Sequence, residues 1–310
     1  MGSHAGRPTH EPAEISSMGS LNVFKKARKP TEAGDATNCL SCPIERSCIY
    51  SAKRLYLDSN LARGFTGWPV KIVVPDIEDC LRNKGKDAAT QKLLGALAED
   101  YTNETPKEQV QARNWFGRCV WECDNDVCDD QFVTISWDDE AKTEPTNGKP
   151  IPKPRQAKTA TLHMVANTYG LGGRRGRIYG TQGEISYDSA SINVMSFLPP
   201  EPVKDDPSDT SFKAPPPLTR PIETFHPSNA GGHGGGDEGL IRQFLSAVID
   251  VKAGTLDVEA AQEKYLGCSI EDVLRSHAVV WAAEESRVSG VKVNWDQWWS
   301  DKSSKYLHQA

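Results

Sequence analysis

The chain has 310 residues, of which 37% are hydrophobic and 25% are charged, a balance typical of a globular protein that builds its own core. A net charge of -6 without a basic stripe argues against nucleic acid and anionic membranes as partners. No run approaches the roughly 20 apolar residues of a membrane-spanning helix, and the first residues lack the apolar core of a signal peptide. We therefore expect a cytoplasmic protein.

The first hundred residues predict mixed structure. Residues 1–18 are rich in Gly, Ser, Pro and His and predict a flexible arm, followed by a short strand at 20–24. A short helix is expected near 51–57, and the β-branched run VKIVV at 70–74 predicts a buried strand. Apolar residues one turn apart predict an amphipathic helix over 87–101.

The middle of the chain changes to alternating patterns that predict strands. The expected strands are 118–124, 130–137, 158–167, 176–180, 183–188 and 192–197. Their short links predict a mostly antiparallel sheet. Two longer connections are expected, a polar hairpin loop at 142–156 and a proline-rich loop at about 198–224.

The last seventy residues have helical periodicity. One helix is predicted over 240–251, and another begins at Ser269, with Asp272 in the position of a capping box. Its apolar stripe needs a surface to cover, and the sheet is the available one. The cluster Trp295, Trp298 and Trp299 predicts an aromatic anchor against the domain.

The predicted fold class is therefore α+β: an open, mostly antiparallel β-sheet with α-helices packed on one face, plus an irregular cysteine-rich segment at about 35–60. One domain is expected over 19–300, followed by a tail at 301–310.

The stretch NCLSCPIERSC carries cysteines with a C-x2-C-x5-C spacing, at Cys39, Cys42 and Cys48. A two-residue gap lets two thiolates reach one ion, so the spacing predicts most of a structural zinc site. An iron-sulfur cluster with the same ligands, or unligated cysteines, are the alternatives. A disulfide framework is disfavoured in a long cytosolic chain, and no strand precedes the motif as a thioredoxin-like dithiol requires.

A fourth metal ligand must come from elsewhere in the chain. Cys119 and Cys123 are candidates because alternate residues of the expected strand RCVWEC point to the same side. Cys128 is a further alternative.

Acid-base groups are predicted in two places. His233 and Asp237 belong to the glycine-rich segment before a helix, where backbone N–H groups favour a carboxylate or hydroxyl-rich ligand, although Asp237 also suits a helix N-cap. His163 lies on an expected strand, where it either faces a binding surface or packs through a hydrogen bond.

The segment GLGGRRGRIYG does not open a helix, so it fails the test for a dinucleotide fingerprint. We interpret it as a glycine-rich turn with an arginine cluster. Arg174, Arg175 and Tyr179 are the expected substrate-binding side chains.

These segments together resemble the C-terminal portion of the Gfo/Idh/MocA oxidoreductases, most closely fungal-type members, from about Gly19 to Trp299. The motifs that carry the resemblance are NCLSCPIERSC, FGRCVWECDNDVCDDQ, AKTATLHMVAN, RRGRIYGTQGEISYD, GHGGGDEGL and IEDVLRSHAVVWAAEESR. The resemblance implies a sheet that shapes a substrate site, and it favours Cys119 as the fourth metal ligand. The family's N-terminal Rossmann domain has no counterpart here, so NAD(P) is not expected to bind this chain alone.

Three functions follow from the resemblance. The first is a cofactor-independent acid-base reaction on a small metabolite, an isomerisation, cyclisation or dehydration, in fungal secondary metabolism. The second is an NAD(P)-dependent oxidoreductase half that needs a separate Rossmann-domain partner. The third is a non-catalytic binding or assembly module, such as a homo-oligomer formed through the sheet.

Overall fold

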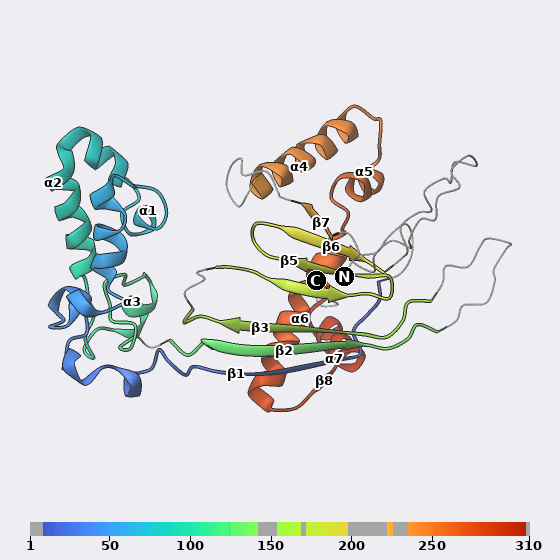
Figure 1. Cartoon of the computed structure of the whole chain (residues 1–310), viewed down its shortest axis with the longest axis horizontal. Helices are drawn as coiled ribbons and strands as arrows, with labels where there is room; N and C mark the ends of the chain where they lie inside the picture. Colours follow the sequence, from blue (N-terminus) through green and yellow to red (C-terminus); the bar gives the residue numbers. More distant parts are fainter. Residues whose placement is uncertain are drawn as a thin grey trace, which may run out of the picture. The chain divides into compact units, whose positions relative to one another are not determined.

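A computed structural model of the chain describes residues 9–123, 125–141, 154–168, 172–197, 222–225 and 235–307. The strands are β1 (Glu14–Ser20), β2 (Asp130–Trp137), β3 (Lys158–Val165), β4 (Gly176–Tyr179), β5 (Gly183–Tyr187), β6 (Ile192–Ser196), β7 (Ile222–Phe225) and β8 (Val293–Asn294). They form two four-stranded sheets with the strand orders β3-β2-β1-β8 and β4-β5-β6-β7 (Figure 1). The fold is therefore a mixture of helices with two small antiparallel sheets.

The α-helices are α1 (Val70–Val73), α2 (Ile77–Ala98), α3 (Lys107–Gln111), α4 (Gly236–Lys252), α5 (Val258–Tyr265), α6 (Ile270–Ser289) and α7 (Trp295–Leu307). Short 3-10 turns are η1 (Lys26–Arg28), η2 (Thr31–Ala33), η3 (Cys39–Ser41), η4 (Glu45–Ser47) and η6 (Leu61–Arg63), and η5 (Lys53–Asp58) is a π-helix.

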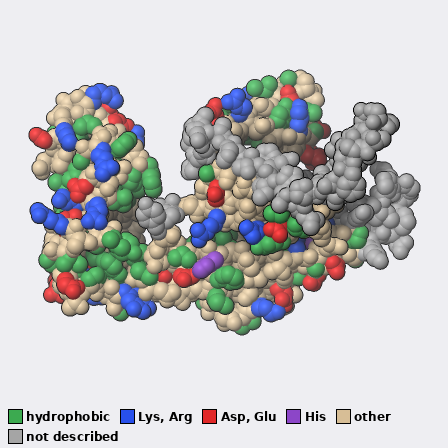
Figure 2. All heavy atoms as spheres, viewed as in Figure 1, with side chains coloured by type: hydrophobic (Ala, Val, Ile, Leu, Met, Phe, Trp, Pro, Cys, Tyr) green, Lys and Arg blue, Asp and Glu red, His purple; other side chains and the backbone are tan. Residues whose placement is uncertain are grey.

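The chain divides into two compact units, and the division falls within β1, β2 and β3. We call the unit made of Ser17–Val133 and Leu162–Asn167 the cysteine unit. The C-terminal unit consists of Met1–Ser16, Thr134–Thr161 and Thr168–Ala310. On the face shown in Figure 2, Lys and Arg side chains are interspersed with Asp and Glu over the described residues.

The cysteine unit has its core between α2 and the irregular segment before it. Leu93 and Leu97, one turn apart on α2, are fully buried, as the apolar pattern predicts. α2 is two helical segments joined at a kink at Gly85, whose φ of 84° is left-handed. The segment after the kink is the helix expected over 87–101, and it ends at Ala98; the segment from Ile77 to the kink was not expected. The core also includes Cys39, so the cysteine-rich segment packs as part of this hydrophobic cluster.

The C-terminal unit contains the sheet β4-β5-β6-β7, in which every neighbouring pair is antiparallel. Helix α6 begins with the predicted capping box. The Ser269 side chain accepts the Asp272 N–H, and the Asp272 carboxylate accepts the Ser269 N–H at 2.9 Å. The strands expected from alternation at 130–137, 158–167, 176–180, 183–188 and 192–197 are confirmed, as are the helices expected in α4 and α6.

Four predicted segments differ from the structure: the arm, the strand at 20–24, the proline-rich loop and the tail. β1 begins at Glu14, inside the expected arm, and Ile15 is fully buried there. β1 ends at Ser20, so the strand expected at 20–24 is wrong beyond its first residue. The alternation of burial along β1 could not be recognised from its sequence, because serine and glycine occupy most of its positions. The expected tail at 301–310 is helical as far as Leu307, and β7 starts at Ile222, inside the expected proline-rich loop.

The prediction of one open sheet is also corrected, because the described strands form two sheets. β1 and β8 were not expected, and they extend β2 and β3 into a sheet separate from β4-β5-β6-β7. The run VKIVV is helix α1 instead of a strand, because prolines on both sides confine it to one helical turn that closes from Val74 N–H to the Val70 carbonyl at 3.1 Å.

Candidate metal centre

An isolated antiparallel bridge between Asn38 and Arg118 brings the two cysteine-bearing segments together. The Cys39 N–H donates to the Gly117 carbonyl and the Cys119 N–H donates to the Thr37 carbonyl, both at 2.8 Å. Residues on either side of a bridged pair point to the same face of a ladder. The bridge therefore places Cys39 and Cys119 on one face, although they are eighty residues apart in sequence.

Two tight turns return the chain to the same place at Cys42 and Cys48. The N–H of Cys42 donates to the Cys39 carbonyl at 3.3 Å, which closes η3, and η4 closes with the Cys48 N–H on the Glu45 carbonyl at 3.2 Å. The Asn38 side chain caps the first turn by accepting the Leu40 N–H at 2.8 Å. The C-x2-C-x5-C spacing is thus the spacing of two consecutive 3-10 turns.

All four predicted metal ligands line one small cavity of about 20 Å³. Cys39 and Cys119 are buried, and Cys42 and Cys48 are half-buried. A cavity of this volume has room for about one water-sized occupant. Glu45 also lines it and was not anticipated from the sequence.

The sulfur atoms have few hydrogen-bond donors around them. The Ala52 N–H donates to Cys39 Sγ at 3.4 Å, and the Trp121 N–H donates to the Cys119 thiol. Burial raises the pKa of both thiols despite these donors, and the thiols of Cys119, Cys48 and Cys42 raise the pKa of Cys39 further. Without a bound cation, Cys39 and Cys119 are therefore neutral thiols.

None of the eight cysteines, all of which lie in described residues, forms a disulfide. Within the same described ranges, no group of three or more Cys, His, Asp or Glu side chains already has an arrangement that could hold a metal ion. The four thiols share a cavity wall, which is a looser condition than coordination. The donor set itself fits a thiophilic ion, because four sulfur ligands and no competing histidine line the cavity.

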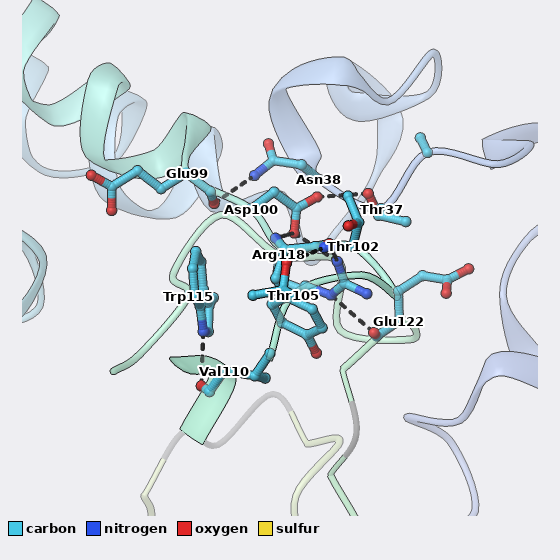
Figure 3. Close-up of polar contacts among 12 residues, drawn as sticks. Thr37, Asn38, Glu99, Asp100, Thr102, Thr105, Val110, Trp115, Arg118 and Glu122 are labelled. Atoms are coloured by element: carbon cyan, nitrogen blue, oxygen red, sulfur yellow. Dashed lines mark hydrogen bonds and ion pairs between the residues drawn. The ribbon is translucent and has the colours of Figure 1, made fainter. Parts of the chain in front are cut away.

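A polar network behind the bridge fixes Arg118 (Figure 3). Its guanidinium donates to the Asp100 carboxylate and to the Tyr101 carbonyl, both at 2.7 Å, and its Nε donates to the Glu122 carbonyl at 3.0 Å. The Thr37 hydroxyl donates to the other Asp100 oxygen at 2.6 Å. Burial would raise the pKa of Asp100, but these donors outweigh it and lower that pKa.

A buried ion pair joins Lys29, before the cysteine segment, to Glu122. Lys29 Nζ lies 2.8 Å from the Glu122 carboxylate and donates to the Ala36 carbonyl at 2.7 Å, and both charged side chains are less than a tenth exposed. Burial would raise the pKa of Glu122, but Lys29 and Lys26 lower it. Nothing in the sequence pattern around Lys29 indicates that its ammonium group has a buried carboxylate partner.

The alternatives for the fourth ligand lie elsewhere. The expected strand RCVWECD is wrong: beyond the bridge at Arg118, the chain turns, with the Glu122 N–H on the Cys119 carbonyl at 2.9 Å. Cys119 and Cys123 consequently do not share a strand face. Cys123 donates to the Val120 carbonyl at 3.2 Å, and neither it nor Cys128 lines the cavity.

Of the predicted acid-base residues, the two that the structure describes, His163 and Asp237, do not line this cavity. His163 lies on β3 in the cysteine unit, half-exposed, with Nε2 at 2.9 Å from Asp130 Oδ1 and its ring 5.9 Å from that of Phe132. Asp237 lies in the first turn of α4, and the N-cap is Gly235, so the N-cap interpretation of Asp237 is wrong. His233 lies outside the described residues.

The predicted substrate-binding residues lie on or just before β4 in the C-terminal unit. Arg174 and Arg175 are exposed, and the Arg174 N–H donates to the Ser189 hydroxyl at 3.1 Å. Tyr179 is exposed beside the Arg177 guanidinium. They do not line the cysteine cavity.

Comparison with known proteins returned no family model, no curated protein and no solved structure that matches this chain. The resemblance to the Gfo/Idh/MocA family therefore stays a prediction from the motifs. Among the described residues, no helix has the length and apolar character required to cross a membrane.

Proposed function

We propose that the chain binds one zinc ion through Cys39, Cys42, Cys48 and Cys119, and that the ion is structural. The observation that carries the proposal is the convergence of these four thiols on a cavity with room for one small occupant. Four thiolate ligands fill a tetrahedral zinc site and leave no position open for substrate, which is the arrangement of structural zinc.

The cavity volume favours a single ion over an iron-sulfur cluster. A cluster of several iron and sulfide atoms needs many times the space of one water molecule, and the cavity holds about one. Zinc also suits a closed all-thiolate site, because it has no geometric preference of its own and takes the tetrahedron that four sulfurs offer.

The ion would fasten an irregular part of the chain to a regular one. Cys42 and Cys48 lie on consecutive turns, whereas Cys119 follows the bridge at Arg118. Cys42 and Cys48 are half-buried, whereas Cys39 and Cys119 are buried, so packing constrains the first two side chains less. Zinc binding would then be coupled to the folding of the cysteine unit.

Cobalt substitution tests the ligand set. Co²⁺ in a tetrahedral thiolate site gives visible absorption bands that its aqueous form lacks, so titration of the metal-free, reduced full chain reports coordination directly. We expect Cys119→Ser to lose the bands of four-thiolate coordination. Cys123→Ser, four residues away and off the cavity, is the matched control and is expected to retain them.

Wild-type bands in Cys119→Ser, or their loss in Cys123→Ser, would overturn this ligand set. Absence of any thiolate-cobalt band in the wild type would overturn the metal site itself.

A second candidate function is the cofactor-independent acid-base reaction on a small metabolite. The observation that favours it is the pair of His163 and Asp130, because a carboxylate at 2.9 Å from a ring nitrogen orients an imidazole for proton transfer. The solvent-accessible ring can reach a substrate, and Phe132 beside it offers an apolar contact.

The masses of the compounds before and after the step test this candidate. If the gene is deleted, the accumulated compound is expected to be isomeric with the product or to differ from it by water. His163→Gln should cause the same accumulation, whereas His277→Gln, an exposed histidine in the C-terminal unit, should not. A difference of two hydrogens would instead indicate a redox step and a Rossmann-domain partner.

A further inference from the structure

Helices α6 and α7 of the C-terminal unit are joined through tryptophans. Trp295 is fully buried and donates its indole N–H to Glu11 at 2.9 Å, so it is the aromatic anchor that the sequence predicts. Its ring stacks on that of Trp299 at 5.6 Å. Trp298 donates its indole N–H to Glu285 on α6 at 2.9 Å. These contacts fix the orientation of the Trp298 and Trp299 rings on α7.

The seam between α6 and α7 is not filled. A cavity of about 490 Å³ lies there, lined by Leu274, Trp281, Glu285, Trp298, Trp299 and Lys302 among others. This volume falls in the range of small-molecule sites, which are mostly apolar with a few polar groups. Trp281 is 64% exposed, so one large ring of the lining is left without packing partners that would bury it.

The charges in this cavity are balanced. Lys302 Nζ lies 2.9 Å from Glu285 Oε2, the same oxygen that accepts the Trp298 indole N–H. The Trp298 indole, with the larger effect, and Lys302 both lower the pKa of Glu285, which keeps this carboxylate ionised. A bound anion would be repelled by this carboxylate, and a bound cation would be repelled by Lys302. An uncharged ligand meets neither repulsion.

We infer that the cavity between α6 and α7 binds an uncharged, planar aromatic small molecule, stacked against the tryptophan rings. Flat rings gain from offset or edge contacts with indoles beyond the area that they bury. A hydroxyl or ring N–H on the ligand can donate to the Glu285 carboxylate, which lines the cavity. The site is independent of the proposed zinc centre, because every lining residue belongs to the C-terminal unit.

Fluorine NMR of the full chain labelled with 5-fluorotryptophan tests the inference, with each resonance assigned by Trp→Phe substitution. The probe is 2-naphthol, and 2-naphthoate is its charged analogue. We expect 2-naphthol to shift the Trp281, Trp298 and Trp299 resonances. Trp68 is the control, since it is 81% exposed, even more than Trp281, and lies in the cysteine unit.

Trp281→Ala should weaken 2-naphthol binding roughly tenfold, as loss of one aromatic contact implies, and Trp68→Ala should leave it unchanged. Because Trp281 is largely exposed, its removal should not unfold the unit, which the unshifted Trp295 resonance would verify. Equal shifts at Trp68 would mean non-specific adsorption and would overturn the inference. Tighter binding of 2-naphthoate would overturn the uncharged class, and shifts that follow protein concentration without probe would assign the surface to a second copy of the chain.

Discussion

At the residue scale, Asp129 orders a segment that has no regular structure. Its carboxylate accepts the backbone N–H groups of Asn22, Val23 and Phe24 at 2.7, 2.6 and 3.0 Å, and the side chain is buried. Burial would raise the pKa of Asp129, but the three donors outweigh it and lower the pKa. The folded-state pKa is thus below the unfolded one, so this contribution is complete above the ordinary aspartate range and is lost as the pH falls through the folded pKa.

Asp129→Asn is expected to destabilise the turn at 22–24 by about 1.5–3 kcal/mol at pH 7, because hydrogen bonds to a charged acceptor become bonds to a neutral one. Faster hydrogen exchange of these three amides measures the loss. The difference between wild type and variant should shrink at acid pH, where the wild-type carboxyl is protonated. Asp126→Asn, exposed and in the same segment, is the control and should exchange like wild type.

Gly117 is required by close packing instead of by its backbone angles. A Cβ at this position would overlap the Leu97 carbonyl oxygen and lie 2.8 Å from Asn38 Nδ2, which itself donates to that carbonyl at 2.8 Å. The clashing Leu97 atom belongs to the backbone, so it cannot move aside as the end of a flexible side chain could. Any larger residue must therefore push the segment of Cys119 off α2.

Gly117→Ala should lower both the stability of the cysteine unit and its metal content, with a loss of about 2 kcal/mol or more, as for other overpacked sites. Gly95→Ala is a matched control on α2: its Cβ would meet open space, and alanine favours a helix over glycine by about 1 kcal/mol. Urea denaturation and metal analysis of the two variants compare these outcomes. Equal metal content in both would contradict the required close approach.

At the element scale, the bridge at Asn38 and Arg118 holds the candidate site together with very little regular structure. Only two backbone hydrogen bonds flank it, and Arg118 adds contacts to Asp100, Tyr101 and Glu122. The guanidinium also stacks on the Tyr101 ring at 3.6 Å. The side chain of Arg118 is only 9% exposed, so its loss leaves Asp100 without its cationic partner in a half-buried setting.

Arg118→Ala is expected to destabilise the cysteine unit by about 2–3 kcal/mol, less than a fully buried pair because Asp100 retains some water contact. Arg113→Ala is the control, since Arg113 pairs with Glu99 at the surface and should contribute less than about 1 kcal/mol. Hydrogen exchange of the Cys39 and Cys119 amides distinguishes the variants. Similar protection in both would contradict the role assigned to Arg118.

The regular elements that could be predicted are those with long, clear periodicity. β2 and β5 alternate along their length, and α6 has both a capping box and an apolar stripe. VKIVV was misassigned because a short β-branched run fits a strand and a buried helical turn equally well. RCVWEC alternates too, but a tight turn brings Cys119 and Trp121 to the cavity and leaves Cys123 off it, and the alternation gives no sign of that turn.

At the scale of the whole molecule, the sequence predicts more of the candidate metal site than of the residues around it. The spacing of Cys39, Cys42 and Cys48 predicts three of the proposed donors because ligand spacing is local in sequence. The position of Cys119 depends on a bridge across eighty residues, and the buried partners Lys29 and Glu122 have no local pattern at all. His233, Asp237 and His163 carry no comparable spacing; His163 and Asp237 belong to different units, and His233 lies outside the described residues.

Removal of the proposed zinc ion from the full chain is expected to affect the two units differently. Amides between 33 and 58 should lose hydrogen-exchange protection after chelation, because zinc binding free energy is coupled to the folding of the segment that supplies the ligands. Amides of β5, in the interior of its own sheet, should keep theirs. Equal loss in both regions would indicate global unfolding instead of a local structural metal.

The most direct test of the central claim is the native mass of the freshly purified full chain, measured together with its metal content. We predict a mass increase of one zinc ion per chain, with protons displaced by thiolate binding, in wild type and Cys123→Ser but not in Cys119→Ser. A metal-free mass with all eight cysteines open to alkylation would contradict the zinc site. Detection of iron and sulfide instead of zinc would show that the cysteines hold an iron-sulfur cluster.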